Sequence, residues 1–356
     1  MPLRSRFAFI AAAAAMIAVN SAQAGGLKKV ADIALPGDTI TDIGIMTIDQ
    51  STGLGYLADK TNKGVAVFDT NTDKFVARVP GFAGRTKDGD VAGPNGVVVV
   101  KNGAEMWASD GDSTIKVIDT KTNKVTSTIN TGGKKRANGM AFADNINTVI
   151  VANSNEETSY LTFVSTEPGN KITGKVEIPE SAENLERSAY HKPSGMFYTA
   201  IPVSKADQTK GLLAQTDPKT GKLVKMHELP CHPHSLSIVS DTTIFLGCSS
   251  VHGPNPKPGG DMVIFDIPSG KVEGSLKDYG GNGGSIANLG VGHYYHSTSG
   301  GILMVVDTKT KQGLQQIKTS RGARSAAVNQ KTNKLYVAVT GKDESCAGCI
   351  AVYALD

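Results

Sequence analysis

Residues 106–125 read MWASDGDSTIKVIDTKTNKV, and this stretch decides the fold. Apolar and polar residues alternate over much of 114–119, as they do in a β-strand whose two faces have different surroundings. The segment TKTN that follows supplies short polar side chains, which bond back to the local backbone and let two strands reverse direction tightly. The stretch therefore predicts a strand, a tight turn and the start of a further strand.

This pattern recurs seven times along the chain, at a period of about 47 residues. The turn is clearest in five copies, and a diverged copy lies near Ser165. The five copies are residues 68–74, 118–124, 216–222, 265–271 and 306–311. Short strands repeated at such a period are typical of a β-propeller. We therefore expect an all-β fold, a seven-bladed β-propeller of four-stranded antiparallel blades.

The seventh copy of the repeat is one strand short. Residues 325–328, 334–339 and 350–355 supply three strands, and the sequence then stops. Residues 28–35 precede the first blade and have strand character, so we expect them to supply the missing outer strand. Pairing the N- and C-terminal strands would close the ring and leave no open edge between the first and last blades.

Two stretches resemble the repeat of the YVTN-repeat β-propeller family. They are residues 114–125 and the strand LYVAV at 335–339. The likeness extends over nearly all of the chain after residue 24 and is strongest in blades two and seven. It implies the fold and leaves the function open, because this and neighbouring families include binding and surface proteins, lactonase-like enzymes and large subunits of amine dehydrogenases.

Residues 1–24 are typical of a secretory signal peptide. Arg4 and Arg6 precede an apolar run over 7–19, and the run ends at an A-x-A cleavage site, residues 22–24. The run is shorter than the roughly 20 apolar residues that a spanning helix needs. We expect cleavage near Ala24, a periplasmic or secreted chain without membrane insertion of its mature part, and a single propeller domain over 25–356.

The charge balance points to no polyanionic partner. The formal net charge is +4, and it falls to +2 once Arg4 and Arg6 are removed with the leader. Neither nucleic acid nor a membrane surface is indicated by so small a charge. The only basic cluster, residues 134–136, is interpreted as a solvated loop. The expected partners are a small-molecule ligand or a periplasmic protein.

Long connections are expected on one face of the ring. Strand direction alternates within a blade, so the loops between second and third strands share a face with the loops between blades. The long connections predicted there are residues 81–94, 202–211, 249–260, 279–284 and 341–349. Binding residues concentrate on loops that a rigid scaffold holds. We therefore expect the functional site on this face.

The central channel should open on the same face, at the first residue of each innermost strand. Aligning the repeats on their turns places Gly44, Asn95, Asn138, Arg187, His234, Gly284 and Arg324 at equivalent positions. The candidate ligand-binding residues are therefore Asn95, Asn138, Arg187, His234 and Arg324. Converging Arg, His and Asn donors suit a carboxylate or phosphate. The alternative is a polar, water-filled channel in which Arg187 pairs with Glu186 or Glu183.

Four cysteines can form disulfides in an exported chain. Cys346 and Cys349 form a CxxC motif in a loop of blade seven; no helix pattern supports a thioredoxin-like pair, and no histidine follows for haem attachment. We favour a loop-closing disulfide there. Cys231 and Cys248 flank one hairpin. Regular pairing would place Ser235 opposite Cys248, so a second disulfide requires the incoming loop to fold back.

No recognisable catalytic set is present, so enzyme activity stays open. We favour a non-catalytic binding protein without a cofactor. One alternative is a lactonase-like hydrolase with a divalent metal such as calcium or magnesium, held by Asn95, Asn138 and Glu186, with His234 as a further ligand or general base. Another is the propeller subunit of a periplasmic redox assembly, similar to the large chains of amine dehydrogenases, which would need a cofactor-bearing partner.

Overall fold

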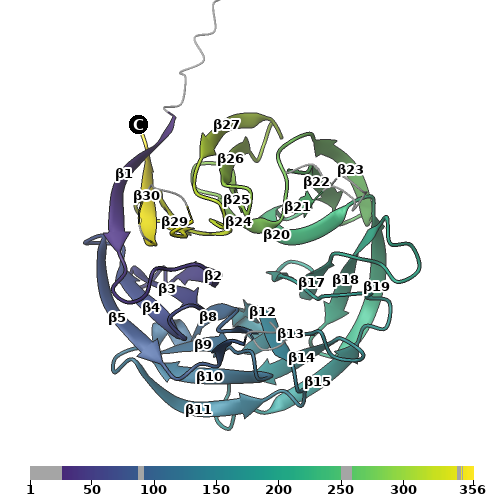
Figure 1. Cartoon of the computed structure of the whole chain (residues 1–356). Helices are drawn as coiled ribbons and strands as arrows, with labels where there is room; N and C mark the ends of the chain where they lie inside the picture. Colours follow the sequence, from purple (N-terminus) through teal and green to yellow (C-terminus); the bar gives the residue numbers. More distant parts are fainter. Residues whose placement is uncertain (1–25, 87–91, 250–258, 343–345, 347) are drawn as a thin grey trace, which may run out of the picture.

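The computed structural model describes residues 26–86, 92–249, 259–342, 346 and 348–356. Within these residues it contains seven four-stranded sheets and one two-stranded hairpin. The sheets surround a common axis, with the chain passing from purple blade one to yellow blade seven (Figure 1). Neighbouring strands within each sheet are antiparallel, as in blades two and three. The prediction of a seven-bladed β-propeller is confirmed.

Each of the first six blades uses four consecutive strands, from the axis outward. Blades one and two consist of β2 (Ile43–Ile48), β3 (Leu54–Asp59), β4 (Gly64–Asp69) and β5 (Lys74–Pro80), then β8 (Val97–Val100), β9 (Glu105–Ser109), β10 (Thr114–Asp119) and β11 (Lys124–Asn130). Blades three and four consist of β12 (Arg136–Ala143), β13 (Thr148–Ser154), β14 (Tyr160–Ser165) and β15 (Ile172–Glu177), then β16 (Ser188–His191), β17 (Met196–Ile201), β18 (Gly211–Asp217) and β19 (Lys222–Leu229). Blades five and six consist of β20 (His232–Ser240), β21 (Thr243–Ser249), β22 (Met262–Asp266) and β23 (Lys271–Leu276), then β24 (Gly283–Asn288), β25 (His293–Thr298), β26 (Ile302–Asp307) and β27 (Gly313–Lys318).

The seventh blade joins the two ends of the described chain. It consists of β28 (Ser325–Asn329), β29 (Lys334–Val339), β30 (Cys349–Leu355) and, as its outer strand, β1 (Leu27–Ala34). The pairing between β1 and β30 runs from Leu27 opposite Leu355 to Ala34 opposite Cys349. The predicted closure is therefore confirmed, and the outer edge of β30 is covered rather than left open.

The hydrophobic core lies between neighbouring blades. One cluster joins Ile43 and Phe68 of blade one to Tyr336 and Ile350 of blade seven. Trp107 is fully buried in blade two and packs with its neighbours in a cluster that reaches blade three. Each blade thus covers the apolar face of the next one, and the stack becomes self-supporting only when the ring is complete.

The two faces of the ring differ as the sequence predicts. One face carries tight turns, such as the one in which Asp119 Oδ1 accepts a hydrogen bond from the Thr122 backbone N–H at 2.7 Å. The other carries the long connections, including the small hairpin of β6 (Gly84–Arg85) and β7 (Ala92–Gly93). Residues 87–91, 250–258, 343–345 and 347 of these connections lie outside the described residues.

None of the helices in the described ranges is long and apolar enough to cross a membrane.

Both predicted disulfides are present. Cys231 pairs with Cys248 across the start of blade five, and Cys346 pairs with Cys349 before β30. The expected strand register around the first pair is wrong by two residues, because Pro233 rather than Ser235 lies opposite Cys248. The register shifts between Pro233 and Ser235, so the start of β20 bends and brings Cys231 within reach of its partner.

Candidate functional site

A narrow cavity lies where the central channel opens onto the face with the long connections. Its volume is about 80 Å³, enough for a few water molecules or one small ion. Residues at the starts of the innermost strands line it, together with one residue that follows β3. The polar lining residues are Lys60, Asn95, Arg136, Asn138, Glu186, Arg187, Asn282 and Arg324.

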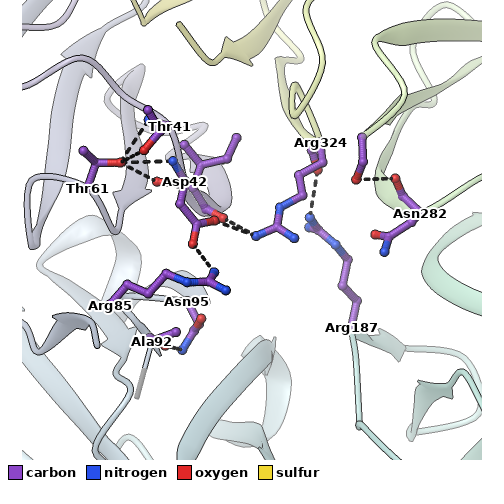
Figure 2. Close-up of polar contacts among 11 residues, drawn as sticks. Thr41, Asp42, Thr61, Arg85, Ala92, Asn95, Arg187, Asn282 and Arg324 are labelled. Carbon is purple, nitrogen blue, oxygen red and sulfur yellow. Dashed lines mark hydrogen bonds and ion pairs between the residues drawn. The ribbon is translucent and has the colours of Figure 1, made fainter. Parts of the chain in front are cut away.

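Arg187 and Arg324 meet across this cavity (Figure 2). The Arg187 side chain extends from blade four, and its Nη2 atom donates a hydrogen bond to the backbone carbonyl of Arg324 at 3.4 Å. Burial in the channel mouth lowers the pKa of Arg187 to about 10; the nearby Glu186 raises it and Arg324 lowers it. Arg187 therefore remains a cation at neutral pH, in a place where a second cation opposes it.

Asp42 orients Arg324 and ties it to the rim of the cavity. Arg324 Nη2 lies 3.0 Å from Asp42 Oδ1 and donates to the Ile43 carbonyl at 2.8 Å, while Arg85 Nη1 lies 2.6 Å from the other Asp42 oxygen. Burial alone would raise the pKa of Asp42, but Lys60 and the two arginines together hold it below its usual value. Asp42 thus stays ionised and holds the guanidinium of Arg324 in a fixed position (Figure 2).

Lys60 is a functional candidate that sequence reasoning missed. It follows β3 and lines the cavity, yet only 5% of its surface is exposed. No side-chain hydrogen bond or ion pair engages its ammonium group within the described part of the chain. Burial lowers the pKa of Lys60 to about 7, and the nearby Arg324 adds to the effect, while Asp42 opposes it. An unpaired buried ammonium is costly, so this position is poised to accept a negative partner.

Arg136 corrects the interpretation of residues 134–136 as a solvated loop. Lys134 and Lys135 are less buried, but Arg136 begins β12 and lines the cavity. Its Nη2 atom donates to the side-chain oxygens of Asn155 and Asn184, at 3.1 and 3.3 Å. Its Nε atom is buried and has no hydrogen-bond partner among the described residues. Burial lowers the pKa of Arg136, and Glu186 opposes that shift.

Asn95 and Asn138 lie in the cavity wall. Asn95 Nδ2 donates to the carbonyls of Ala92 and Ala137, at 2.6 and 2.8 Å, while its Oδ1 atom is buried without a partner among the described residues. Asn138 Nδ2 donates to the Leu185 carbonyl at 2.9 Å. The two amides therefore connect blades two, three and four. The Oδ1 atom of Asn95 can still accept a hydrogen bond from a ligand in the cavity.

His234 occupies the predicted strand position but does not line the cavity. Its Nε2 atom lies 3.0 Å from Ser249 Oγ, at the end of the neighbouring strand β21. The shift of register that follows Pro233 in β20 changes the direction in which this residue faces. Blade five therefore contributes no side chain to the described cavity wall.

Gly284 gives the space that Arg187 occupies. A Cβ atom at Gly284 would lie 2.6 Å from Arg187 Nη2 and 2.7 Å from the Arg324 carbonyl oxygen. Any larger residue at this position would have to displace the guanidinium or the strand behind it. The lack of a side chain at Gly284 therefore makes room for the Arg187 guanidinium and is required for this arrangement of the site.

The electrostatics of the cavity favour an anion. Four cationic side chains, of Lys60, Arg136, Arg187 and Arg324, line it, and Glu186 is the one carboxylate among its described lining residues. A wider groove of about 780 Å³ continues from Arg324 past Arg85 and Lys342, which extends the positive surface outward. Arginine and lysine donors at such a density match the oxygens of a carboxylate or phosphate.

The same residues do not fit a calcium or magnesium ion. The amide oxygens of Asn95 and Asn138 are neutral ligands, and His234 lies outside the cavity. Glu186 alone would supply a carboxylate, whereas hard divalent cations are held by several oxygen ligands. Four neighbouring cations would also repel a metal ion.

Comparison with known proteins shows the fold alone. No protein family profile matches the chain, and no curated protein sequence matches it. Among solved structures, a chain of the Kuenenia stuttgartiensis hydrazine synthase is similar, with a TM-score of 0.72 and 13% identity over 89% of this chain and 96% of that one. A chain of the mitotic checkpoint complex has a TM-score of 0.68 and 8% identity over 99% of both chains. Both likenesses agree with a propeller fold. At such low sequence identities they give no information about the activity of this protein.

Proposed function

We propose that this protein is an exported binding propeller that recognises a small anion at its channel mouth. The observation that carries the proposal is the convergence of Arg187, Arg324, Arg136 and Lys60 on one cavity with a single carboxylate in its described wall. Arg136 keeps a buried Nε atom without a hydrogen-bond partner among the described residues, and Lys60 is only 5% exposed. An anion would satisfy both groups at once.

The carboxylate or phosphate oxygens would lie between the side chains of opposite blades. Arg187 comes from blade four and Arg324 from blade seven, so a ligand between them is held from two sides of the ring. An anion between the two guanidinium groups would attract both of them and so offset their mutual repulsion. The long connections around the mouth supply the surface that surrounds such a ligand or a protein that carries it.

Export of the chain is a second part of the proposal. It rests on the leader pattern of residues 1–24 and on the two disulfides, which persist in oxidising compartments. N-terminal sequencing of the protein from a periplasmic or secreted fraction would test it. A mature terminus near Gly25 is expected, and an intact Met1 in the cytosolic fraction would contradict it.

A thermal unfolding screen of the mature protein tests the anion site. Phosphate, sulfate, citrate and acetate should raise the midpoint of unfolding in a concentration-dependent manner, because a ligand of the folded form stabilises it by mass action. Chloride at matched ionic strength is the control for screening of charge. If no multivalent or carboxylate anion shifts the midpoint beyond chloride, the proposal fails.

A further inference from the structure

The channel below the mouth has a different character from the mouth itself. A second cavity, of about 400 Å³, lies among the innermost strands of all seven blades. Aliphatic side chains form a large part of its wall. Six of them are Ile45, Val97, Met140, Leu236, Ile238 and Ile286. A channel filled with water alone would gain nothing from such a lining, because apolar surface in contact with water is unfavourable.

Two residues line both cavities, Ile45 and Arg187. Ile45 is partly exposed and belongs to none of the hydrophobic clusters found between the described blades, so its side chain is available to the channel. Arg187 places its guanidinium in the mouth, beside Arg324. The positively charged cavity and the aliphatic channel therefore meet at Ile45 and Arg187. A ligand that spans this junction would have its polar group in the mouth and its apolar part in the channel.

We propose that the ligand is an amphipathic monocarboxylate, with its carboxylate among Arg187, Arg324 and Lys60 and its aliphatic chain along the channel past Ile45. The inference rests on the proposed function, since the carboxylate is the anion of that site. The cationic side chains at the mouth favour the carboxylate group of the ligand, and the aliphatic wall of the channel favours a hydrocarbon chain for the remainder of the ligand.

The far end of the channel is compatible with chains of several carbons. Leu289 follows β24, which starts at the mouth, so Leu289 lies at the opposite face of the ring. It lines the channel and is 58% exposed, which is unusual for a leucine in a folded core. A chain that reaches this residue would cover apolar surface along the whole depth of the innermost strands.

Calorimetric titration with acetate, butanoate, hexanoate and octanoate tests the inference. Each further methylene that enters the channel should tighten binding by about fourfold. Ile286→Ser changes a residue that lines only the lower cavity, so it should remove much of the gain for octanoate and leave acetate binding unchanged. Arg187→Met should weaken every member of the series. Leu314→Ser is the matched control, because Leu314 is 50% exposed on the outer strand β27 and far from the channel.

The outcomes separate this inference from the anion site. Equal affinities for acetate and octanoate, both lost in Arg187→Met, would overturn the amphipathic ligand and leave the anion site standing. Failure of all four carboxylates, and of phosphate, would overturn both. Octanoate binding that neither variant changes would place the chain elsewhere and overturn the inference. If Ile286→Ser no longer binds acetate, Ile286→Val, which lacks one methylene, should show a smaller loss of affinity for octanoate alone. An unchanged affinity for octanoate in Ile286→Val would contradict the assignment.

Discussion

The guanidinium of Arg187 donates a hydrogen bond to the backbone carbonyl of Arg324, although 137 residues separate them in the sequence. Three whole blades, four, five and six, lie between them along the chain. Only a closed ring brings these residues together, so the candidate site depends directly on the global fold. An array of blades that failed to close would retain each strand and lose this contact.

Replacing both arginines with alanine should abolish anion binding. Each charge-assisted hydrogen bond to the ligand contributes on the order of 1.5–3 kcal/mol, so Arg187→Ala with Arg324→Ala should remove the thermal shift given by phosphate or sulfate. The control is Lys121→Ala with Lys309→Ala, which removes the same charge from turns on the opposite face. An unchanged shift in the arginine variant would remove the channel-mouth assignment.

Gly284→Ala should weaken anion binding without unfolding the protein. The new methyl group would lie 2.6 Å from Arg187 Nη2 and 2.7 Å from the Arg324 carbonyl oxygen, so the guanidinium must shift and its contact with that carbonyl must change. We expect an affinity for sulfate close to that of Arg187→Ala, measured by calorimetry. Gly274→Ala is the matched control, because no described atom lies within 4 Å of the methyl group that it adds. Wild-type affinity in Gly284→Ala would show that the position of Arg187 does not matter.

Anion affinity should fall as the pH rises through the pKa of Lys60. That pKa is about 7 in the cavity without a ligand, and a bound anion would raise it because the ammonium gains an opposite charge. Binding then takes up a proton, and the dissociation constant for sulfate should increase between about pH 6 and pH 9. Sulfate keeps its charge over this range. Calorimetry at several pH values checks the trend, and Lys60→Met should flatten it; a steep dependence that persists in the variant would assign it to another group.

Lys60 should also make the folded state less stable at neutral pH. Its pKa falls from 10.5 to about 7 on folding, so the unfolded chain binds more protons between these values. The free energy of unfolding contributed by Lys60 therefore rises with pH across this window and is lowest below about pH 7. Lys60→Met should raise stability at pH 7 in the absence of anions, by on the order of a few kcal/mol. Urea unfolding at pH 7 and pH 10 measures both effects, and a destabilised variant at pH 7 would contradict the reasoning.

The two disulfides should differ in their effect on stability. Cys231 and Cys248 are separated by 17 residues. Closing a loop of this size lowers the conformational entropy of the unfolded chain and so stabilises the folded state by roughly 3 kcal/mol. Cys346 and Cys349 are separated by three residues, so their link restricts the unfolded chain much less. The variant Cys231→Ala with Cys248→Ala should therefore lose more unfolding free energy than Cys346→Ala with Cys349→Ala. Equal losses by denaturant titration would contradict this ranking.

The architecture and part of the site could be predicted from the sequence because both follow from the repeat. Strand alternation and turn residues place Asn95, Asn138, Arg187 and Arg324 at equivalent positions, and the structure brings these four to one cavity. The irregular parts could not be predicted in this way. His234 departs from the pattern because the register of β20 shifts, an event without a signal in the turn alignment.

Lys60 and Arg136 show the second limit of pattern reasoning. Lys60 follows a second strand rather than beginning a first one, so an alignment of innermost strands passes over it. Arg136 shares a basic cluster with two lysines that do not line the cavity, although it is the residue at which β12 begins. In both cases burial is decided by neighbouring blades that are distant in sequence. Such residues could be identified from the predicted long-loop face, because every charged residue at a strand end on that face is a candidate for lining the channel mouth.

The pairing of β1 with β30 also determines how this molecule can be attached to anything else. Leu27 and Leu355 lie opposite each other, and Lys28 Nζ is 2.5 Å from a carboxylate oxygen of Asp356. Because β1 runs toward the mouth face, these residues lie at the base of the outer edge. A tether joined directly before Leu27 or after Asp356 would therefore leave from the underside of the ring, and a protein immobilised in this way would present its mouth to the solution.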